Sequence, residues 1–461
     1  MVQQDFRMNS AYLDEALQWL FPGSMRFDKE LRGDCSWTFL TLIKTALLWA
    51  WSVEQKMTER FHCAQRLVIH LQADQAKRAT SWQSFAEMLR RHTDYLRGIL
   101  ITRLRKRMAE ELPDLWKMFG FVVLGVDGTD IAVPLTQSNK DAFSAKKTLG
   151  KRCRRKKQKG KKKKTDEGAD KRSAAPQVLL TTLFVVRLNL PWNWRFGSRG
   201  DSERGQLRLM LDDLPEDCLI AADAGFVGYD LATEILRDDR KSQMVMRVGA
   251  NIRLLKKLGY VREKAGIVYL WPEKAARKNQ PPLVFRLIVM QGLKHPVYLI
   301  TSVLDDKELS DQQVIEIYKA RWGIEVYHRH LKQTFGLRKL LSRSSRNAEI
   351  ELEWSLLSIW AMGLYASVEL CRQELELERL SFASVLSAFR EMARDYKHAA
   401  NPRRTLRILL RHSLLDTYHR TKPKGSRGYP RKKKHKQAGA PDIQNATNQQ
   451  RNQAKQLKKN P

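Results

Sequence analysis

The spacing of apolar residues along the chain predicts helical outer regions and a middle region rich in strands. Between positions 82 and 108, apolar residues recur at the spacing of an amphipathic helix beneath many arginines, namely Phe85, Leu89, Leu96, Leu100 and Leu104. Helical spacing returns from about Asp311, and further helices are expected at 354–368, 380–395 and 404–415. We therefore predict an N-terminal helical DNA-binding region over residues 1–118 and a C-terminal helical region over 351–420. The arginines of 82–108 fit either contact with DNA or a solvated face.

Short runs of strand type fill the middle of the chain. In order, we expect a strand, a tight turn and a second strand (121–126, 127–129 and 131–134), a long β-type stretch (177–190), a helix (202–214) and a buried strand (218–222). Four further β runs form a β-rich insertion over about 240–308, at 243–248, 267–271, 284–290 and 297–303. This order predicts an α/β fold with a mixed sheet.

Basic residues exceed acidic residues by 34, an excess that indicates a polyanionic partner. Nucleic acid is the leading candidate, and an anionic membrane surface is the rival. Two segments of low complexity, 146–172 and 421–461, contribute +12 and +11 of this charge, and we expect both to be disordered without a polyanion. The remaining +11 lies on the folded body.

Cysteines and apolar stretches argue against other classes of protein. The five cysteines form no C-x-x-C pair, which disfavours a structural zinc site and fits a reducing cytosol. Residues 1–7 lack the apolar core of a signal peptide. Segments 36–53 and 354–368 come nearest to a membrane span, but Lys44 interrupts the first and the second is short. We interpret both as buried helices.

Four polar residues recur at helical spacing in the pattern Tyr318-x2-Arg321-x3-Glu325-x6-Lys332. On one continuous α-helix they share a stripe about 60° wide, at about 100° per residue. An ion pair between Arg321 and Glu325 on a solvated face would explain this stripe. A metal-binding carboxylate flanked by phosphate-binding cations is the alternative, although the helix taken alone favours the ion pair.

Two aspartates favour the metal-binding interpretation. Asp127 and Asp223 each follow a short apolar run, and a parallel sheet presents functional side chains at the carboxyl ends of its strands. Each could merely cap a turn. Together with Glu325, however, they form a set that can hold two magnesium ions for phosphodiester cleavage. Asp130, expected in the turn after Asp127, and Glu203 are weaker candidates.

The four-residue spacing resembles the signature of the insertion-sequence transposases of the IS-four family, which are cut-and-paste DDE enzymes with a ribonuclease-H-like core. Asp127-Gly128-Thr129 and Asp223 after its strand resemble the family's first and second aspartates. The gap between Asp223 and Glu325 accommodates the β-rich insertion of the family. The resemblance implies a ribonuclease-H-like catalytic domain over residues 119–350.

The resemblance also implies a role for individual residues. Asp127, Asp223 and Glu325 would be the catalytic carboxylates and would hold two Mg²⁺ ions, for which Mn²⁺ can substitute. The residues that would bind DNA phosphates are Tyr318, Arg321 and Lys332, with Arg247 as a further contact. Two more residues have weaker assignments: His328 could assist proton transfer, and Trp322 would pack beside the signature arginine.

The expected function is DNA strand cleavage at element ends and strand transfer into target DNA. The partners would be double-stranded DNA with terminal inverted repeats, target DNA and a second copy of the chain in a synaptic complex, with the helices after Leu352 as the dimer surface. The expected location is the bacterial cytoplasm at the nucleoid, without a membrane partner. Two alternatives stay open, a non-catalytic DNA-binding relative and a ribonuclease-H-like nuclease. Trp271 would either stack an extruded base of a DNA hairpin or pack in the core.

Overall fold

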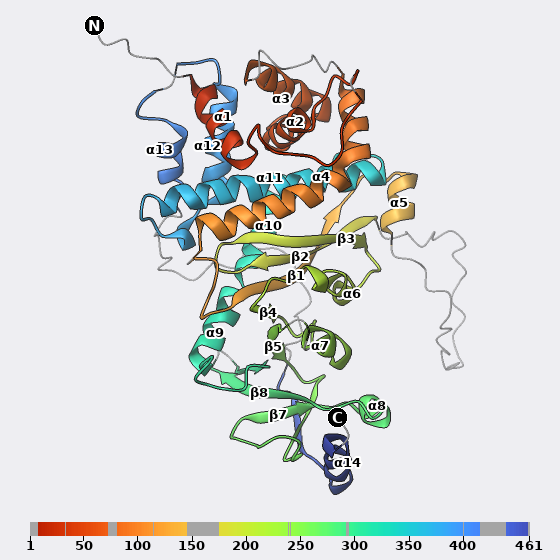
Figure 1. Ribbon diagram of the computed structural model, residues 1–461. Helices are drawn as coiled ribbons and strands as arrows, with labels where there is room; N and C mark the ends of the chain where they lie inside the picture. The colour runs from red at the N-terminus through yellow and green to blue at the C-terminus, as the bar shows by residue number, and fades with distance from the viewer. Residues whose placement is uncertain are drawn as a thin grey trace, which may run out of the picture.

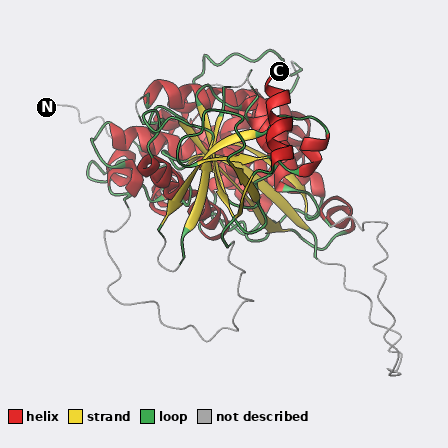
Figure 2. Cartoon of the chain, turned by 90° about the horizontal axis from the view of Figure 1, so that it is seen from below, coloured by secondary structure: helices red, strands yellow, loops and turns green. Residues whose placement is uncertain are grey.

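The computed structural model describes residues 8–32, 34–71, 81–113, 115–144, 175–237, 239, 241–291, 295–399, 401–414 and 439–459. A layer of helices covers one end of a long mixed sheet, and the sheet continues away from this layer (Figure 1). Viewed along the perpendicular direction, the strands twist through the centre of the molecule with helices around them (Figure 2). In the described residues this sheet has ten strands, in the order β10-β6-β7-β8-β9-β5-β4-β1-β2-β3.

The centre of the sheet consists of β1 (Val122–Ala132), β2 (Gln177–Val185), β3 (Leu190–Ser198), β4 (Cys218–Ala222) and β5 (Gln243–Val248). Strands β1, β2 and β3 are antiparallel, whereas β4 and β5 run parallel to β1. All residues of β4 are buried, as expected for a parallel strand that is covered on both faces. This order and these directions give the ribonuclease-H-like mixed sheet that the sequence predicts.

The predicted turn at 127–129 is wrong. Strand β1 runs without interruption through Asp127-Gly128-Thr129, and its pairing with β2 extends from Leu124↔Val185 to Ala132↔Gln177. Asp, Gly and Thr are common in turns, but here β2 supplies the hydrogen-bond partners that keep this part of β1 extended. A tight turn between neighbouring strands comes later, between β2 and β3, where Asn189 has a positive φ of 54°.

The β-rich insertion continues the same sheet. Its strands are β6 (Arg253–Lys256), β7 (Ile267–Leu270), β8 (Leu283–Met290) and β9 (Val297–Thr301), and a short helix α8 (Glu273–Arg277) follows β7. Strand β9 pairs antiparallel with β5 and joins the insertion to the centre of the sheet. The predicted β runs at 243–248, 267–271, 284–290 and 297–303 are confirmed as β5, β7, β8 and β9.

The prediction of a disordered C-terminal tail is wrong for residues 439–459. There, β10 (Asp442–Asn445) pairs in parallel with β6, and α14 (Asn448–Lys459) follows it. The tail was predicted to be disordered because it is rich in basic residues. However, Ala446 and Ala454 are buried against the insertion, so even this polar segment has an apolar inner face. Residues 421–438 and the basic insert 146–172 lie outside the described residues.

The helical layer surrounds one long buried helix, α11 (Ser345–Cys371). The other helices of this layer are α1 (Asn9–Leu20), α2 (Phe39–Trp51), α3 (Met57–Leu71), α4 (Trp82–Glu111), α12 (Phe382–Arg394) and α13 (Leu406–Arg411), with the 3-10 turn η2 (Leu377–Arg379). Helix α11 is long and apolar enough to cross a membrane, but 94% of its apolar window is buried inside the fold. It is therefore the core helix on which α2, α4 and β3 pack, as the sequence predicts.

Shorter elements lie along the sheet: α5 (Gln137–Phe143), α6 (Glu203–Arg208), η1 (Leu211–Asp213), α7 (Tyr229–Ile235), α9 (Asp311–Ala320) and α10 (Gly323–Gln333). The helix predicted at 202–214 is thus only six residues long and ends in a 3-10 turn. The apolar residues of α9 form a second core with the opposite face of β4 and β5. Helices α9 and α10 therefore approach the sheet at the carboxyl ends of its parallel strands.

Candidate active site

Asp127 and Asp223 lie next to each other where the parallel pairing of β1 and β4 ends, with Asp127 in the middle of β1 and Asp223 directly after β4. The parallel register of β1 and β4 ends with the pair Val126↔Ala222, and the two aspartates are the residues that follow. Asp223 Oδ1 accepts hydrogen bonds from the backbone NH of Ala224 at 2.8 Å and from the Tyr318 hydroxyl at 3.3 Å. An Arg247 guanidinium nitrogen lies 3.8 Å from the same oxygen. Side chains from both β5 and α9 therefore contact the Asp223 carboxylate.

The single continuous helix predicted for the four signature residues is wrong, because a two-residue turn interrupts it. Helix α9 ends at Ala320, Arg321 and Trp322 form a turn with helical backbone angles, and α10 begins at Gly323. A Cβ atom at Gly323 would lie 2.6 Å from Asn189 Oδ1, so glycine lets α10 begin directly against the β2–β3 turn. On either side of this turn the signature has a buried half and an open half.

Tyr318 and Arg321 form the buried half, with 9% and 5% of their surface exposed. The stem of Arg321 lies over Gly125, and its guanidinium is 5.3 Å from the centre of the Tyr318 ring. One guanidinium nitrogen is 3.7 Å from Glu325 Oε1, and Nε has no hydrogen-bond partner in the part of the chain that the structure describes. Arg321 is therefore a buried cation with donor capacity left beside a carboxylate.

The Asp127 carboxyl has a raised pKa of about 6. Burial is the main cause, and the negative charges of Glu325 and Asp223 raise the pKa further. The backbone NH of Gly128 and the charge of Arg321 oppose this shift. The three predicted carboxylates therefore lie close enough to repel one another, although they come from three separate elements.

His328 packs behind Asp127. Its Nδ1 is 3.8 Å from Asp127 Oδ2, and its Nε2 is 3.4 Å from the hydroxyl of Thr182. Burial, and then the charge of Lys332, lower the pKa of His328 to about 3. The imidazole is therefore neutral at physiological pH, which fits a residue that positions Asp127 better than one that exchanges protons.

The carboxylates fit divalent cations by their chemistry. The side chains of Asp127, Asp223 and Glu325 are 30%, 49% and 41% exposed, and they offer the hard oxygen ligands that Mg²⁺ prefers. A cation would also relieve the repulsion that raises the pKa of Asp127. Within the described ranges, no three His, Cys, Asp or Glu side chains already form a group that could hold a metal ion.

A cavity of about 380 Å³ opens beside Asp127 and Glu325. Its cationic lining comes from Lys332, which was predicted, and from Arg329 and Arg338, which were not. Arg329 follows Glu325 by one helical turn, a spacing that could have revealed it. Arg338 has no such signal, because it reaches the site only through the backbone bonds by which residues 338–340 pair with Ala132.

Glu203 of α6 is a fourth carboxylate near this site. A Cβ atom at Gly128 would collide with the Glu203 carboxylate, so the glycine beside Asp127 permits this close approach. Burial, and then the charges of Asp127 and Asp130, raise the pKa of Glu203. Asp130 itself is an exposed residue of β1 and not the predicted turn residue.

The structure tests the roles that the sequence suggested for two tryptophans. Trp271 is 4% exposed, and its indole NH donates to the carbonyl of Gln280 at 2.8 Å, so its interpretation as a core residue is confirmed. Trp322 is 60% exposed, so its predicted packing role is wrong. It lies in the turn between α9 and α10, with its indole exposed to solvent.

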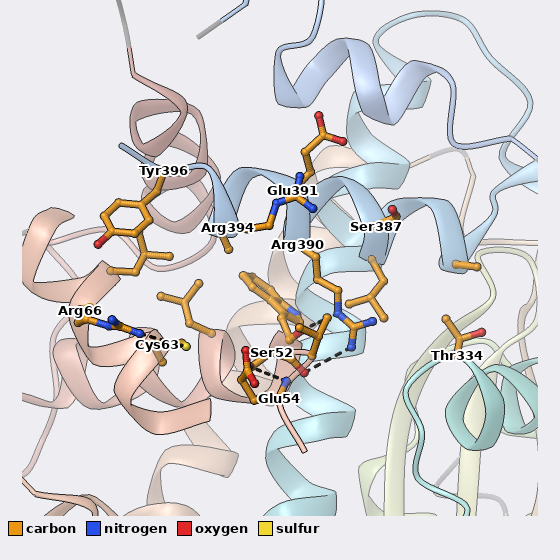
Figure 3. Close-up of a pocket in the computed structure, with 18 residues that line it drawn as sticks. Ser52, Glu54, Cys63, Arg66, Thr334, Ser387, Arg390, Glu391, Arg394 and Tyr396 are labelled. Atoms are coloured by element: carbon orange, nitrogen blue, oxygen red, sulfur yellow. Dashed lines mark hydrogen bonds between the residues drawn. The ribbon is translucent and has the colours of Figure 1, made fainter. Parts of the chain in front are cut away.

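A larger cavity of about 690 Å³ lies away from this site, between α2, α3 and α12 (Figure 3). Two of its arginines already have hydrogen-bond or ion-pair partners within the protein. Arg390 donates to the carbonyls of Trp51 and Ser52, and Arg394 pairs with Asp395 at 2.7 Å. These bonds fasten α12 to the end of α2, so we assign the cavity a structural role.

Comparison with known proteins identifies the family of the chain. The family profile of the transposase DDE domain matches residues 119–361, which is more than half of the chain. The chain therefore belongs to the family of transposases with a DDE domain.

Two insertion-sequence transposases are similar to this chain in sequence. The chain is 23% identical over 258 residues to the transposase InsG of insertion sequence element IS4 from Escherichia coli, covering 54% of this chain and 53% of InsG. It is 25% identical over 161 residues to a transposase of element IS4SA from Synechocystis, covering 34% and 43%. The chain thus spans about half the length of these relatives. The predicted resemblance to the IS-four family is confirmed.

A solved structure of the piggyBac transposase synaptic complex with hairpin DNA is also similar. It covers 90% of this chain and 83% of its own, with a TM-score of 0.40 and 12% identity.

Proposed function

We propose that the chain is a cut-and-paste DNA transposase that cleaves DNA strands at the ends of a mobile element and transfers them into target DNA. One observation carries the proposal: Asp127 and Asp223 directly follow the last parallel pair of β1 and β4, and the charge of Glu325 from α10 acts on Asp127. Membership in the DDE-domain family supports it.

In this proposal Asp127, Asp223 and Glu325 are the catalytic residues and hold two Mg²⁺ ions, with Mn²⁺ as a substitute. When bound, such ions stabilise charge on the attacking and leaving oxygens of an in-line displacement at phosphorus. The protein residues orient the carboxylates. The Tyr318 hydroxyl fixes Asp223, and the buried guanidinium of Arg321 directs Glu325.

The proposed phosphate-binding side chains differ in how exposed they are. Lys332 lies in the open cavity with Arg329 and Arg338, where phosphates of an element end can reach all three cations. Arg247 and Tyr318 meet the DNA on the Asp223 side, through a half-buried guanidinium and a hydroxyl. Arg321 would contribute its unpaired Nε from beneath the carboxylates.

The proposed partners are double-stranded DNA, as element ends with inverted repeats and as target, and a second copy of the chain. Two ends have to be held together for transfer, so we propose a homodimer with the helices after Leu352 as its surface. The excess of 34 basic residues supports a DNA partner. We place the protein at the nucleoid in the bacterial cytoplasm.

The test is cleavage of a duplex that carries the inverted repeat of the element, with Mg²⁺, by wild type and by Glu325→Gln. A matched control is Glu316→Gln, because Glu316 is an exposed glutamate on the preceding helix. We expect cleavage by wild type and by the control, and none by Glu325→Gln. Equal cleavage by all three would overturn the assignment. No cleavage by wild type, with binding retained, would indicate a non-catalytic relative, and preference for an RNA–DNA hybrid would indicate a nuclease.

A further inference from the structure

Lysines gather at the far end of the sheet, where the C-terminal segment docks on the insertion. Residues 250–290 and 439–458 together contain 12 Lys or Arg and 3 Asp or Glu. We call five exposed lysines of this end the basic platform: Lys257, Lys274, Lys278, Lys455 and Lys458. Their density on a small part of the fold makes this end the strongest candidate for a second contact with a polyanion.

The platform is one surface because α14 is fixed to the insertion by specific bonds. Arg451 donates to the carbonyl of Lys257 at 2.8 Å, and the Gln453 amide donates to the carbonyl of Ala276 at 2.7 Å. Ala454 is completely buried on the inner face of α14. Figure 1 shows α14 beside α8 at the end of the molecule opposite the helical layer. Cations from segments nearly 180 residues apart in sequence are thereby held in place together.

The acidic residues of this region do not neutralise the platform. Asp442 pairs with Arg253 at 3.4 Å, and Glu273 pairs with Arg277 at 3.3 Å. The Glu263 carboxylate accepts hydrogen bonds from the hydroxyl of Tyr269 and the backbone NH of Gly259. Among the described residues, no ion pair involves any of the five platform lysines. Their charges are therefore available to an external partner.

The arginine-rich helix α4 provides an instructive contrast. Arg97 donates to the carbonyl of Trp194 at 3.0 Å, Arg105 to that of Trp192 at 3.0 Å, and Arg107 to that of Trp19 at 3.2 Å. Arg91 pairs with Glu87 at 2.7 Å. These arginines hold α4 against β3 and α1. Basic sequence alone therefore does not show which cations are free to bind a polyanion.

The sheet connects the platform to the candidate active site. From β5, which carries Arg247, the strands follow in the order β9, β8, β7, β6 and β10. Five steps of about 4.8 Å give roughly 24 Å between β5 and β10. At about 3.4 Å per base pair, a duplex that passes Arg247 needs about seven more base pairs to reach the platform.

We propose that the basic platform binds the phosphate backbone of duplex DNA about seven base pairs or more from the cleaved bond. This inference rests on the proposed function, because the DNA must also occupy the carboxylate site. The platform reads no base sequence. It adds affinity and fixes the direction in which the duplex leaves the site.

The test replaces three platform lysines in the full chain, Lys278→Gln, Lys455→Gln and Lys458→Gln. The control removes the same charge from three lysines that already have acidic partners, Lys56→Gln, Lys106→Gln and Lys117→Gln. Binding is measured by fluorescence anisotropy in EDTA, so that no strand is cleaved, over a range of salt concentrations. One probe is a duplex with 20 base pairs on either side of the cleavage site, and a second is trimmed to five on either side.

We expect the platform variant to reduce the slope of log affinity against log salt by about 2.7 on the long duplex, since each lost phosphate contact contributes about 0.9. On the trimmed duplex its slope should match that of wild type. The control should bind both duplexes like wild type. Equal slopes for the two variants on the long duplex would overturn the proposal, and so would a larger loss of affinity for single-stranded RNA. Because these measurements need no chemistry, they remain decisive even if Glu325→Gln cleaves normally.

Discussion

Replacing Asp127 by asparagine should stabilise the metal-free protein at neutral pH while it abolishes cleavage. The fold raises the pKa of Asp127 from 3.8 to about 6, mainly through burial. A shift of about 2 units corresponds to about 3 kcal/mol between the two protonation states. Because 30% of the side chain is exposed, solvent screening reduces the expected effect to about 1–2 kcal/mol.

The sign follows from the direction of the shift. Below the unfolded-state pKa of 3.8, Asp127 is protonated in both states and adds no penalty. As pH rises through about 6, the folded protein has to ionise a buried carboxyl, so stability is lost between roughly pH 4 and pH 6. Asparagine cannot ionise, so the advantage of Asp127→Asn should grow across this window and stay constant above it.

Differential scanning calorimetry in EDTA at pH 4 and pH 8 measures this advantage. For 461 residues, an unfolding entropy of about 2.1 cal/mol/K per residue converts 1–2 kcal/mol into a rise of about 1–2 °C at pH 8. Mg²⁺ should raise the melting temperature of wild type and not that of the variant. Asp28→Asn, at an exposed position in the loop after α1, is the control. An equal or lower melting temperature for Asp127→Asn at pH 8 would refute the electrostatic reasoning.

Two further substitutions test other parts of the structure. Lys332→Ala should weaken binding to element ends by about 1.5–3 kcal/mol, the contribution of a hydrogen bond to a charged group, and leave Mn²⁺ binding intact. Anisotropy and electron paramagnetic resonance measure the two effects, and the opposite pattern would contradict the role of Lys332. Asp14→Ala should destabilise the helical layer by about 3 kcal/mol, because Lys44, with 0% of its side chain exposed, loses its partner at 3.1 Å. Adding Lys44→Met should restore most of the loss in chemical unfolding, and a stable Asp14→Ala single variant would show that the ion pair is dispensable.

Periodicity predicted most elements of this fold because most segments bury one continuous face. The strands β4, β5, β7, β8 and β9 and the helices α4 and α11 could be read from apolar spacing alone. Spacing and resemblance together also identified Asp127, Asp223 and Glu325 as one set, and the charge of Glu325 does act on Asp127.

Features that depend on distant partners could not be predicted. Asp127-Gly128-Thr129 has the composition of a turn, but pairing with β2 keeps it extended. The close approach that requires glycine at position 323 is to Asn189, more than 130 residues earlier in the chain. Arg338 enters the site through a backbone pairing with Ala132. In each case tertiary contacts override the local preference of the sequence.

Four neighbouring signature residues lie in two different environments, on either side of the turn between α9 and α10. Tyr318 and Arg321 are buried, whereas Glu325 and Lys332 line the open cavity. The charge of the buried Arg321 opposes the repulsion among the carboxylates, as its effect on the pKa of Asp127 shows. Lys332 stays in the open cavity, where it can meet DNA. The carboxylates can therefore stay close together before a cation arrives, because a cation of the protein already lies beneath them.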